Sequence, residues 1–317
     1  MNDQQRIRAW HFGPGGVRGR GGMGRFLAYL IPTLGRENPD MDCTVVDTYG
    51  PGAFWRMPFW FAGALLRLAW NAGRGRIDLV HLHMAAYGSI LRKALVLSVA
   101  RVFHLPTILH LHGADFVEFI DRLPRIMRIF LINRLKSATY LVVIGEYWCY
   151  YLTQTLGIPA GQVVVIHNGV PDPLEETGFA PRNASRDGGR LLSLGELGPR
   201  KGTPELLAAL ATPQVRALRW SAIVAGNGPV AEYREEARRL DLADRVDLPG
   251  WIESAEAWRL LAESDVFLLP SRMEGLPVAI LEAMAMGVAV IPTPVGAIAD
   301  AIEDGVTGLL VPPGDAP

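Results

Sequence analysis

Two glutamates in one apolar segment are the residues whose type and spacing most clearly favour chemistry. Glu274 and Glu282 are eight residues apart in SDVFLLPSRMEGLPVAILEAMAMG, residues 264–287. The segment predicts a buried strand, a loop with Glu274, and an apolar helix over 278–286, in which Glu282 needs a polar partner. Two carboxylates that flank one helix start and only accept hydrogen bonds suit the hydroxyl groups of a sugar nucleotide.

The start of this predicted helix is a candidate anion site. Pro277 stands where a first helical turn begins, a position that suits its fixed φ and missing N–H. The backbone amides of Gly275 and Leu276 would then point outward, where free N–H groups and the helix dipole favour phosphate or polarised sugar oxygens. The alternative is two solvated glutamates, which the Pro and Gly punctuation disfavours.

Adjacent cations follow another predicted strand. Arg200 and Lys201 come after LLSLG in the segment LGELGPRKG. Two fixed positive charges are what a departing diphosphate needs when no metal is held. The sequence shows no clustered Asp pair and no His/Cys ligand set, so we expect a metal-free mechanism over a Mg²⁺ site. The alternative is that both cations are solvated loop charges.

Two histidine pairs end neighbouring strand-like runs. His81 and His83 lie in DLVHLH, and His110 and His112 lie in TILHLHG, so alternation places each pair on one side of its strand. Their spacing matches no standard zinc pattern, and such pairs are more often core or cleft residues than metal ligands. His112, next to Gly113, is the one expected in a cleft because strand-end loops carry function in α/β sheets.

A glycine-rich loop, GPGGVRGRGGMG at residues 13–24, follows the first predicted strand and precedes a helix expected over 25–34. Such a loop invites a dinucleotide-binding interpretation, with Asp47 as the candidate ribose ligand, although the motif alone is weak evidence. Its glycines would let the backbone approach a ligand closely, because no Cβ intervenes.

Short apolar runs rich in β-branched residues alternate with helix-like stretches along the chain. They are IRAWHF, CTVVDTY, DLVHLH, TILHLH, YLVVIG, VVVIHN, LLSLG, SAIVAG, RVDLPG, DVFLLP, VAVIP and GLLVP. This alternation predicts parallel, doubly wound sheets, and the number of strands exceeds one such sheet. We therefore expect an α/β protein of two Rossmann-like domains facing a cleft, at 1–171 and 190–317, with a Pro/Gly-rich linker at 172–189.

The composition is that of a folded protein, with 50% hydrophobic and 20% charged residues, which excludes disorder as the main state. Cys43 and Cys149 are too few for a disulfide framework or a zinc cluster. No basic-then-apolar secretory signal opens the chain. These observations favour a reducing, cytoplasmic location.

Charge is divided unevenly along the chain. Residues 1–170 carry 18 Lys and Arg against 10 Asp and Glu, whereas residues 171–317 carry 13 against 22. The basic first half favours an anionic partner such as lipid, pyrophosphate or nucleic acid, and mutual attraction between the domains is the alternative.

One aromatic and basic stretch, residues 53–70, is typical of a helix that lies in a lipid interface. No apolar run reaches the ~18–20 residues that span a bilayer. A core helix would explain the same residues, since their periodicity is not clean. The stretch holds Phe54, Trp55, Arg56, Phe59, Trp60, Phe61, Arg67 and Trp70.

The segment EGLPVAILEAMAMGVAVIPTPVG resembles the Glu-x7-Glu signature of the retaining glycosyltransferases of family 4, which have the GT-B fold. Further segments resemble family members in the same order along the chain. These are the loop with Gly21 and Gly22, DLVHLH, HLHGAD with His112, VIHNGV, the RKG loop, GNGP and GVTGLLVPPGD. The resemblance spans nearly the whole chain, and the combination is more specific than any one motif.

The resemblance implies a donor site in the second domain and two catalytic candidates. Glu282 would bind the ribose hydroxyls, Glu274 would orient the donor sugar, and His112 would lie near that sugar. Many family members have an arginine directly after the loop glycine, where this chain has Glu196, so Arg200 would fill that place. The other implied donor-binding residues are Arg200, Lys201, Gly195, Gly275, Leu276, Gly21 and Gly22.

The activity implied is that of a retaining, metal-independent hexosyltransferase without a cofactor, in exopolysaccharide, lipopolysaccharide or glycolipid assembly. The expected partners are a UDP- or GDP-sugar, a saccharide or lipid-linked saccharide acceptor and an anionic membrane at the inner face of the plasma membrane, with no nucleic acid. Two alternatives remain: a sugar-nucleotide epimerase or phosphorylase, and a non-catalytic glycan- or lipid-binding protein. Since relatives continue through further helices, the chain is expected to be truncated after Pro317.

Overall fold

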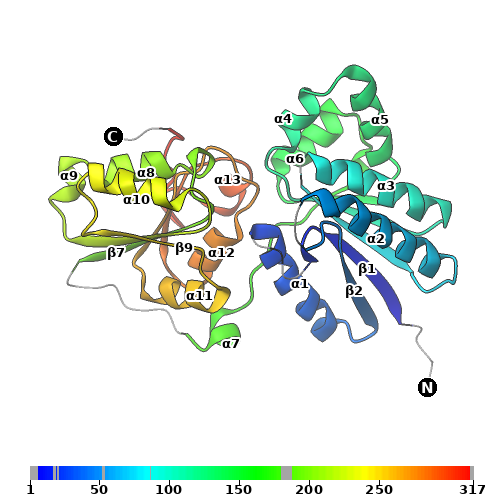
Figure 1. Cartoon of the computed structure of the whole chain (residues 1–317), viewed down its shortest axis with the longest axis horizontal. Coiled ribbons are helices and arrows are strands. Elements are labelled where there is room, and N and C mark those ends of the chain that lie inside the picture. The colour runs from blue at the N-terminus through cyan, green and yellow to red at the C-terminus, as the bar shows by residue number, and fades with distance from the viewer. Residues whose placement is uncertain are drawn as a thin grey trace. The chain divides into compact units, whose positions relative to one another are not determined.

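A computed structural model of the chain (Figure 1) describes residues 6–16, 19, 21–51, 54–85, 87–179 and 188–314, except the side chain of Phe54. It divides into two compact units, Met1–His167 and Asn168–Pro317. The division precedes the predicted linker at 172–189, whose residues 180–187 lie outside the described part. The linker therefore stays a prediction.

The first unit is built on a six-stranded, all-parallel sheet with the strand order β2-β1-β3-β4-β5-β6. The predicted apolar runs form its strands, because a parallel strand is covered by other elements on both faces and is apolar along its length. The strands are β1 (Ile7–Gly13), β2 (Met41–Asp47), β3 (Leu79–Met84), β4 (Thr107–Leu111), β5 (Tyr140–Val143) and β6 (Val163–Val165).

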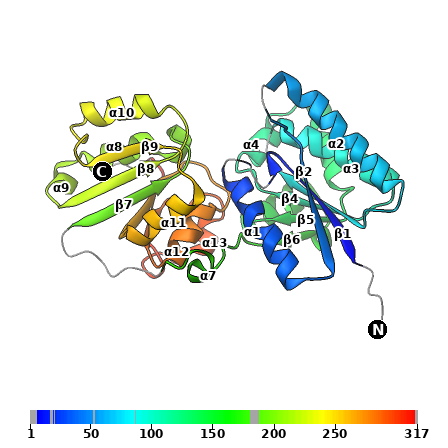
Figure 2. The same ribbon diagram turned by 60° about the horizontal axis from the view of Figure 1, so that its bottom comes forward.

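Helices cover both faces of this sheet. Figure 2 shows α1 on one side and α2 and α3 on the other, as right-handed crossovers to opposite sides of β1 require. Helix α3 packs against both α2 and α5. The helices are α1 (Gly22–Glu37), α2 (Met57–Ala72), α3 (Gly88–Val102), α4 (Phe116–Asp121), α5 (Arg125–Leu135) and α6 (Glu146–Tyr150).

Helix α1 begins three residues before the predicted start at residue 25, because the last glycines of the glycine-rich loop enter its first turn. A Cβ on Gly24 would lie 1.8 Å from the carbonyl oxygen of Gly19. The absence of a side chain therefore lets the loop pack directly against the helix.

The second unit has a five-stranded, all-parallel sheet in the order β11-β10-β7-β8-β9. Figure 1 shows α8 and α10 on one side of it and α11 and α12 on the other. The strands are β7 (Gly189–Leu194), β8 (Trp220–Ala225), β9 (Val246–Gly250), β10 (Val266–Leu269) and β11 (Ala289–Pro292). The helices are α7 (Pro173–Thr177), α8 (Thr203–Leu210), α9 (Pro213–Arg216), α10 (Val230–Arg239), α11 (Ser254–Glu263), α12 (Val278–Ala285) and α13 (Ile298–Ala301).

The predicted strand GLLVP, residues 308–312, is wrong, since this described segment forms no strand. The amides of Leu309 and Val311 each donate at 3.0 Å to a carbonyl of β11. Pro312 and Pro313 have no N–H to donate, so pairing stops after two bonds. The prediction of two Rossmann-like, parallel-sheet α/β domains is nevertheless confirmed.

Each sheet has one point where the strand order reverses. Strand β1 is followed by β2 on one side while β3 lies on its other side, and β7 is followed by β8 while β10 lies on its other side. Ligands of open α/β sheets bind outside the carboxyl ends of the strands at such a point. The residues predicted to do chemistry lie near such strand ends: Lys201 follows β7, Glu274 follows β10 and His112 follows β4.

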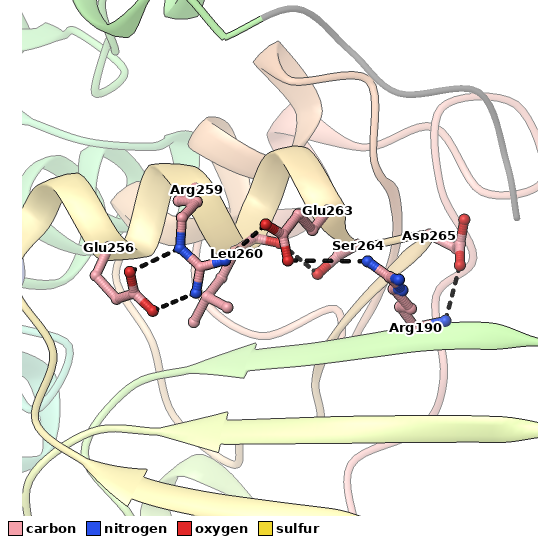
Figure 3. A network of polar contacts seen from close by, with 7 residues as sticks. All are labelled: Arg190, Glu256, Arg259, Leu260, Glu263, Ser264 and Asp265. Carbon is pink, nitrogen blue, oxygen red and sulfur yellow. Dashed lines mark hydrogen bonds and ion pairs between the residues drawn. The ribbon is translucent and has the colours of Figure 1, made fainter.

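Charged residues at the amino end of β7 join the second sheet to α11 (Figure 3). The amide of Arg190 donates to Asp265 Oδ2 at 2.7 Å, and its guanidinium lies 3.8 Å from Glu263 Oε2. Arg259 bridges Glu256 and Glu263 along the helix, with contacts as short as 2.6 Å. These ion pairs are partly exposed, so they contribute little to stability.

Candidate functional site

The best-defined polar cluster of the second unit lies at the carboxyl ends of β7 and β10. Lys201 Nζ lies 2.5 Å from Glu274 Oε1, and the hydroxyl of Ser271 donates to the same oxygen at 2.6 Å. The Lys201 and Glu274 side chains are only 16% and 6% exposed, so little water screens their attraction. We call Lys201, Ser271 and Glu274 the lysine–glutamate cluster.

Two strand-end loops approach closely to make this cluster. Gly202 has a φ of +71°, and a Cβ there would lie 1.9 Å from the carbonyl oxygen of Pro270, so the contact requires glycine. The predicted Gly195 borders the Lys201 stem, since a Cβ on it would lie 3.3 Å from Lys201 Cε. The structure thus brings together the loops after β7 and β10, because these strands are neighbours in the sheet.

Helix α12 starts after the cluster, but its ends differ slightly from the prediction. Pro277, with a ψ of 123°, is the N-cap residue outside the first turn, and Ala285 rather than Met286 is the last helical residue. Among the described residues, the backbone amides of Gly275 and Leu276 have no acceptor. Two N–H groups beside a helix start are suited to bind an anion or a sugar oxygen.

Two side chains that support this helix start were not predicted. Asn168 Nδ2 donates to the carbonyl of Leu276 at 2.7 Å, and Ser271 joins Glu274 as described above. The hydroxyl of Thr293 in turn donates to the carbonyl of Ser271. Asn168 belongs to the segment VIHNGV, which the resemblance marked, whereas nothing local distinguishes Ser271 from other loop serines.

The remaining predicted donor residues of the second unit are placed differently. Glu282 is fully buried in α12, as an apolar helix predicts for a carboxylate with polar contacts. Arg200 is 42% exposed, and its guanidinium lies 3.4 Å from Glu196 Oε2. Among the described residues, Arg200 forms its ion pair with Glu196 and not with Glu274. Glu196, which stands where many family members have an arginine, therefore forms an ion pair with Arg200, the residue expected to take the place of that arginine.

The first unit gathers five histidine rings from β1, β3 and the end of β4. Neighbouring rings lie 4.0–5.7 Å apart between centroids, and Phe26 of α1 packs against three of them. The two predicted pairs share one face, as alternation requires, but the fifth ring was not predicted to join them. The histidine cluster consists of His11, His81, His83, His110 and His112.

The sequence showed no metal-ligand set, yet the histidine cluster contains two groups of three imidazole nitrogens within 4.8 Å of one another. Sequence spacing disfavours a metal at the four histidines of β3 and β4 and gives no sign of His11. Strand order, which places β1 and β4 on either side of β3, brings both groups together. They are His11, His81 and His83, and His83, His110 and His112.

Burial lowers the pKa of every histidine in the cluster. Desolvation brings the pKa of His11 to about 4. Desolvation, followed by the nearby His81 and Lys93, brings the pKa of His112 to about 3. The rings are therefore neutral at pH 7. The pKa also lies well below its usual value, chiefly through burial, for His81, His83 and His110.

A buried lysine near this cluster was also missed. Lys93 of α3 is fully buried, and its Nζ donates to Thr48 Oγ1 at 2.8 Å. Burial, followed by repulsion from Arg92, lowers its pKa to about 7. Lysine is rarely buried unless it is paired. The nearby Asp47 carboxylate raises the pKa of Lys93 only in part, and its oxygens accept backbone amides. Lys93 was missed because a lysine next to an arginine in a predicted helix is normally expected to be solvated.

The predicted glycines of the first unit lie at the start of α1. Gly21 is the N-cap and Gly22 the first helical residue, and a Cβ on either would meet nothing within 4 Å. Asp47, the candidate ribose ligand of the dinucleotide interpretation, is already occupied by backbone contacts. Asp47 uses both carboxylate oxygens, at 2.7–3.0 Å, to accept backbone amides of Gly15, Tyr49 and Gly50.

The aromatic stretch mostly faces outward, so the core-helix interpretation is wrong for it. Trp55, Phe59 and Trp70 are 69%, 76% and 61% exposed, whereas Phe61 is buried. Helices α3 and α5 add further exposed apolar side chains. We call these exposed side chains, together with Trp55 in the short turn Phe54–Arg56 before α2, the apolar surface of α2, α3 and α5. They are Trp55, Phe59, Trp60, Leu66, Trp70, Leu91, Leu95, Val102, Ile126, Met127, Ile129 and Phe130. No helix in the described ranges has the length and hydropathy to cross a bilayer.

Solved structures share this architecture. Sucrose-phosphate synthase from Thermosynechococcus elongatus matches with a TM-score of 0.78 and 21% identity, over 98% of this chain and 87% of that one. Anabaena Alr3699/HepE in complex with UDP matches with a TM-score of 0.71 and 20% identity, over 98% and 86%. The class is therefore that of the GT-B fold, with two Rossmann-like domains.

Family models identify the two domains. The model "Glycosyltransferase Family 4" matches residues 20–172, and the model "Glycosyl transferases group 1" matches residues 188–317. The chain thus belongs to the glycosyltransferase families with the GT-B fold, with one characteristic domain in each half. This confirms the architecture that the sequence resemblance implied.

Two of the curated relatives carry names from polysaccharide biosynthesis. The putative colanic acid biosynthesis glycosyltransferase WcaL of Salmonella typhimurium is 31% identical over 190 residues, 57% of this chain. The amylovoran biosynthesis glycosyltransferase AmsK of Erwinia amylovora is 30% identical over 249 residues, 75% of this chain. The chain spans 46% and 58% of the length of these two relatives.

Proposed function

We propose that this chain is a retaining glycosyltransferase. It moves a hexose from a UDP- or GDP-sugar to an acceptor hydroxyl in exopolysaccharide, lipopolysaccharide or glycolipid assembly. The observation that carries the proposal is the lysine–glutamate cluster beside the open start of α12. The polysaccharide products named for WcaL and AmsK, and the UDP bound to HepE, support the same classes of product and donor.

Donor binding is proposed for the second unit. The Lys201 ammonium would neutralise the diphosphate, and the free amides of Gly275 and Leu276 would donate to its oxygens or to the sugar. Glu274 would accept hydrogen bonds from sugar hydroxyls, and Glu282 from the ribose. Arg200 and Gly195 complete the proposed donor-binding residues of this unit. Gly21 and Gly22 of the first unit remain donor contacts that only the resemblance implies.

The proposed reaction keeps the anomeric configuration. The bond between the anomeric carbon and the diphosphate oxygen breaks as the acceptor oxygen bonds to the same face, and the departing phosphate takes the acceptor proton. Lys201 is already held 2.5 Å from Glu274, so its charge is in place when negative charge develops on the leaving group. Glu274 orients the sugar, His112 is the second proposed catalytic residue, and no metal ion or cofactor takes part.

The proposal is tested by donor binding and turnover. We expect UDP-glucose or GDP-mannose, and not ADP-glucose, to raise Tm by mass action. That donor should release its nucleoside diphosphate in the presence of EDTA and a saccharide acceptor, with retained configuration by NMR. Stabilisation by none of the three would contradict the donor assignment.

The same assay separates the alternatives, which no observation favours. An epimerase converts the donor without an acceptor, and a phosphorylase acts on adding inorganic phosphate. A binding protein raises Tm without turnover. Each result would replace the transferase proposal.

We also propose that the apolar surface of α2, α3 and α5 holds the protein at the inner, cytoplasmic face of the plasma membrane, where a lipid-linked acceptor would lie. Arg74 stacks 3.2 Å above the ring centroid of Trp70, and Arg56 lies 5.8 Å from that of Trp55. Exposed aromatic side chains paired with cations are typical of proteins that bind the headgroup region of anionic membranes.

Vesicle flotation tests this membrane proposal. Replacing both Phe59 and Ile126 with Ser should reduce flotation with anionic vesicles, and salt should weaken the binding of the parent chain. The control is Val306→Ser, because Val306 is 70% exposed in the second unit and outside this surface. Absence of flotation at low salt, or equal loss in the control, would contradict the proposal.

A further inference from the structure

Three members of the histidine cluster form a continuous chain of ring contacts that starts at the end of β4. His112 Nε2 lies 3.1 Å from His83 Nδ1, and His83 Nε2 lies 3.3 Å from His11 Nδ1. Both contacts are short enough for N–H···N hydrogen bonds. His83 and His11 are 0% and 1% exposed, whereas His112 is half-buried. Both nitrogens of His83 are therefore used, and one nitrogen remains at each end of the chain.

The protons of this chain can be arranged in two ways, because a neutral imidazole carries one N–H. If the N–H groups point inward, His112 donates to His83 and His83 to His11, which leaves an N–H on His11 Nε2. If they point outward, His11 donates to His83 and His83 to His112. The second arrangement leaves a bare nitrogen at His11 Nε2 and a proton on His112 Nδ1.

The inner end of the chain selects between these arrangements. His11 Nε2 is buried, and the described residues offer it no hydrogen-bond partner. A buried N–H without an acceptor is rarer in proteins than an under-used acceptor. The outward arrangement is therefore favoured, and the exchangeable proton lies on the half-buried His112.

We propose that His83 and His11 are positioning residues that hold His112 as the neutral tautomer with its proton on Nδ1. Among the described residues no acceptor takes this proton, so it is available to an oxygen of a bound ligand. That the ligand is a nucleotide sugar rests on the proposed function. His112 then acts as a fixed, neutral hydrogen-bond donor and not as a general acid or base.

The surroundings of His112 support a neutral ring. The groups that interact with it are His81, His83, His110 and Lys93, and none of them is a carboxylate that would stabilise an imidazolium. The same composition disfavours a metal ion. A divalent cation held by His83, His110 and His112 would place two positive charges in the interior of the unit without a counter-charge.

The tautomer can be read directly by NMR of the full chain labelled with ¹⁵N-histidine. We expect the His112 spectrum to show a protonated Nδ1 and a bare Nε2 at pH 7, with the same pattern for His83 and His11. A proton on Nε2 of His112 would overturn the proposal. This experiment uses the unmodified protein without ligand, so it does not depend on any variant folding or on any activity.

Two substitutions of one residue sharpen the test. His83→Asn keeps a side-chain N–H near the position of Nδ1, so His112 should keep its tautomer, whereas His83→Leu should release it. His81→Asn is the matched control, because His81 lies on the same strand but makes no hydrogen bond in this chain among the described residues. If His83→Leu leaves the His112 tautomer unchanged in a folded protein, the positioning role is wrong.

Kinetics and metal binding separate the remaining outcomes. With an active donor, His83→Leu should lower kcat/KM roughly 3- to 10-fold, the usual value of one neutral hydrogen bond, and His83→Asn should restore it. If no sugar nucleotide binds or reacts but the Nδ1–H tautomer is present, the proposed function fails and the positioning role stands. Stoichiometric binding of added Zn²⁺ that shifts the His83 and His112 signals would overturn the positioning role in favour of a metal site.

Discussion

The two units place opposite kinds of chemistry at the ends of their central strands. In the first unit the histidine cluster is neutral, because burial lowers the pKa of every ring. In the second unit Lys201 and Glu274 form an ion pair 2.5 Å long with little exposure. In the proposed function, the neutral histidines therefore serve as fixed hydrogen-bond donors, and the fixed charges of the second unit match the charge of a ligand.

The largest expected effect comes from the charged site. Glu274→Gln keeps the shape of the side chain but removes its negative charge, so it should lower kcat on the order of 10²-fold, as the loss of one preorganised electrostatic contact does. Steady-state kinetics with a donor and acceptor would measure it, and Glu256→Gln on α11 is the exposed control. Near-normal kcat in a folded variant would move the active site away from α12.

Lys201 should matter more than its neighbour Arg200. Lys201 contacts Glu274, whereas Arg200 is held by Glu196 at 3.4 Å and is 42% exposed. Lys201→Met should weaken binding of a nucleoside diphosphate by about 10- to 100-fold, the range of a hydrogen bond to a charged group. Binding of the nucleoside should change little.

Titration calorimetry with both ligands would measure these affinities, and Arg200→Met is the matched control with a smaller expected loss. Equal losses for nucleoside and diphosphate would show that the lysine acts through loop folding. A larger loss from Arg200→Met would show that the arginine leaves Glu196 to bind the ligand.

Lys93 is a buried amine close to the neutral histidine cluster, and it should make stability depend on pH. Its pKa falls from 10.5 to about 7, so between these pH values the unfolded chain binds more protons than the folded chain. The free energy of unfolding should therefore rise from pH 7 towards pH 10.5 and be lowest below pH 7.

Lys93→Met should remove this dependence and stabilise the protein at pH 6 by about 1 kcal/mol or more, since one pKa unit corresponds to ~1.4 kcal/mol. Urea unfolding at several pH values would measure the effect. Lys136→Met, at an exposed lysine of the same unit, should change neither the stability nor its pH dependence. Destabilisation by Lys93→Met would mean that the ammonium and Thr48 are needed to hold the end of β2.

The smallest effect is expected from charges away from the strand ends. The hydrogen bond from Arg259 lowers the pKa of Glu256, so this pair supports folding above the usual pKa of glutamate and loses that support as pH falls. The Arg259 and Glu256 side chains are 44% and 43% exposed, so Arg259→Gln should shift Tm by less than ~2 °C. A large loss in a melting experiment would mean that the network at the start of β7 anchors the sheet.

The fold followed closely from local patterns. Eleven of the apolar runs became parallel strands, because a run apolar on both sides of the backbone is stable only between two covering layers. The segment GLLVP forms no strand, because Pro312 at its end and Pro313 after it have no N–H to donate to a ladder. The position of α12 also followed from the sequence, since Pro277 and the preceding glycine mark the helix start.

The candidate site was predictable only where its residues are near in sequence. Glu274, Gly275 and Leu276 lie in one segment, and the resemblance covers that segment, whereas their individual roles stay predictions. The outward face of α2 could not be predicted, because an apolar helix without a clean stripe packs equally well in a core or on a membrane. Its exposure depends on how α3 and the sheet lie beneath it.

The sequence by itself determined eleven of the strands, the start of α12 and the residue types at the strand ends. These depend on side-chain volume, polarity and backbone freedom within a few residues. The tertiary structure alone decided which strand ends meet. It brings Lys201 to Glu274 across 73 residues and His11 to His83 across 72. Contacts over such distances follow from strand order, which the crossover connections set and which no local pattern encodes.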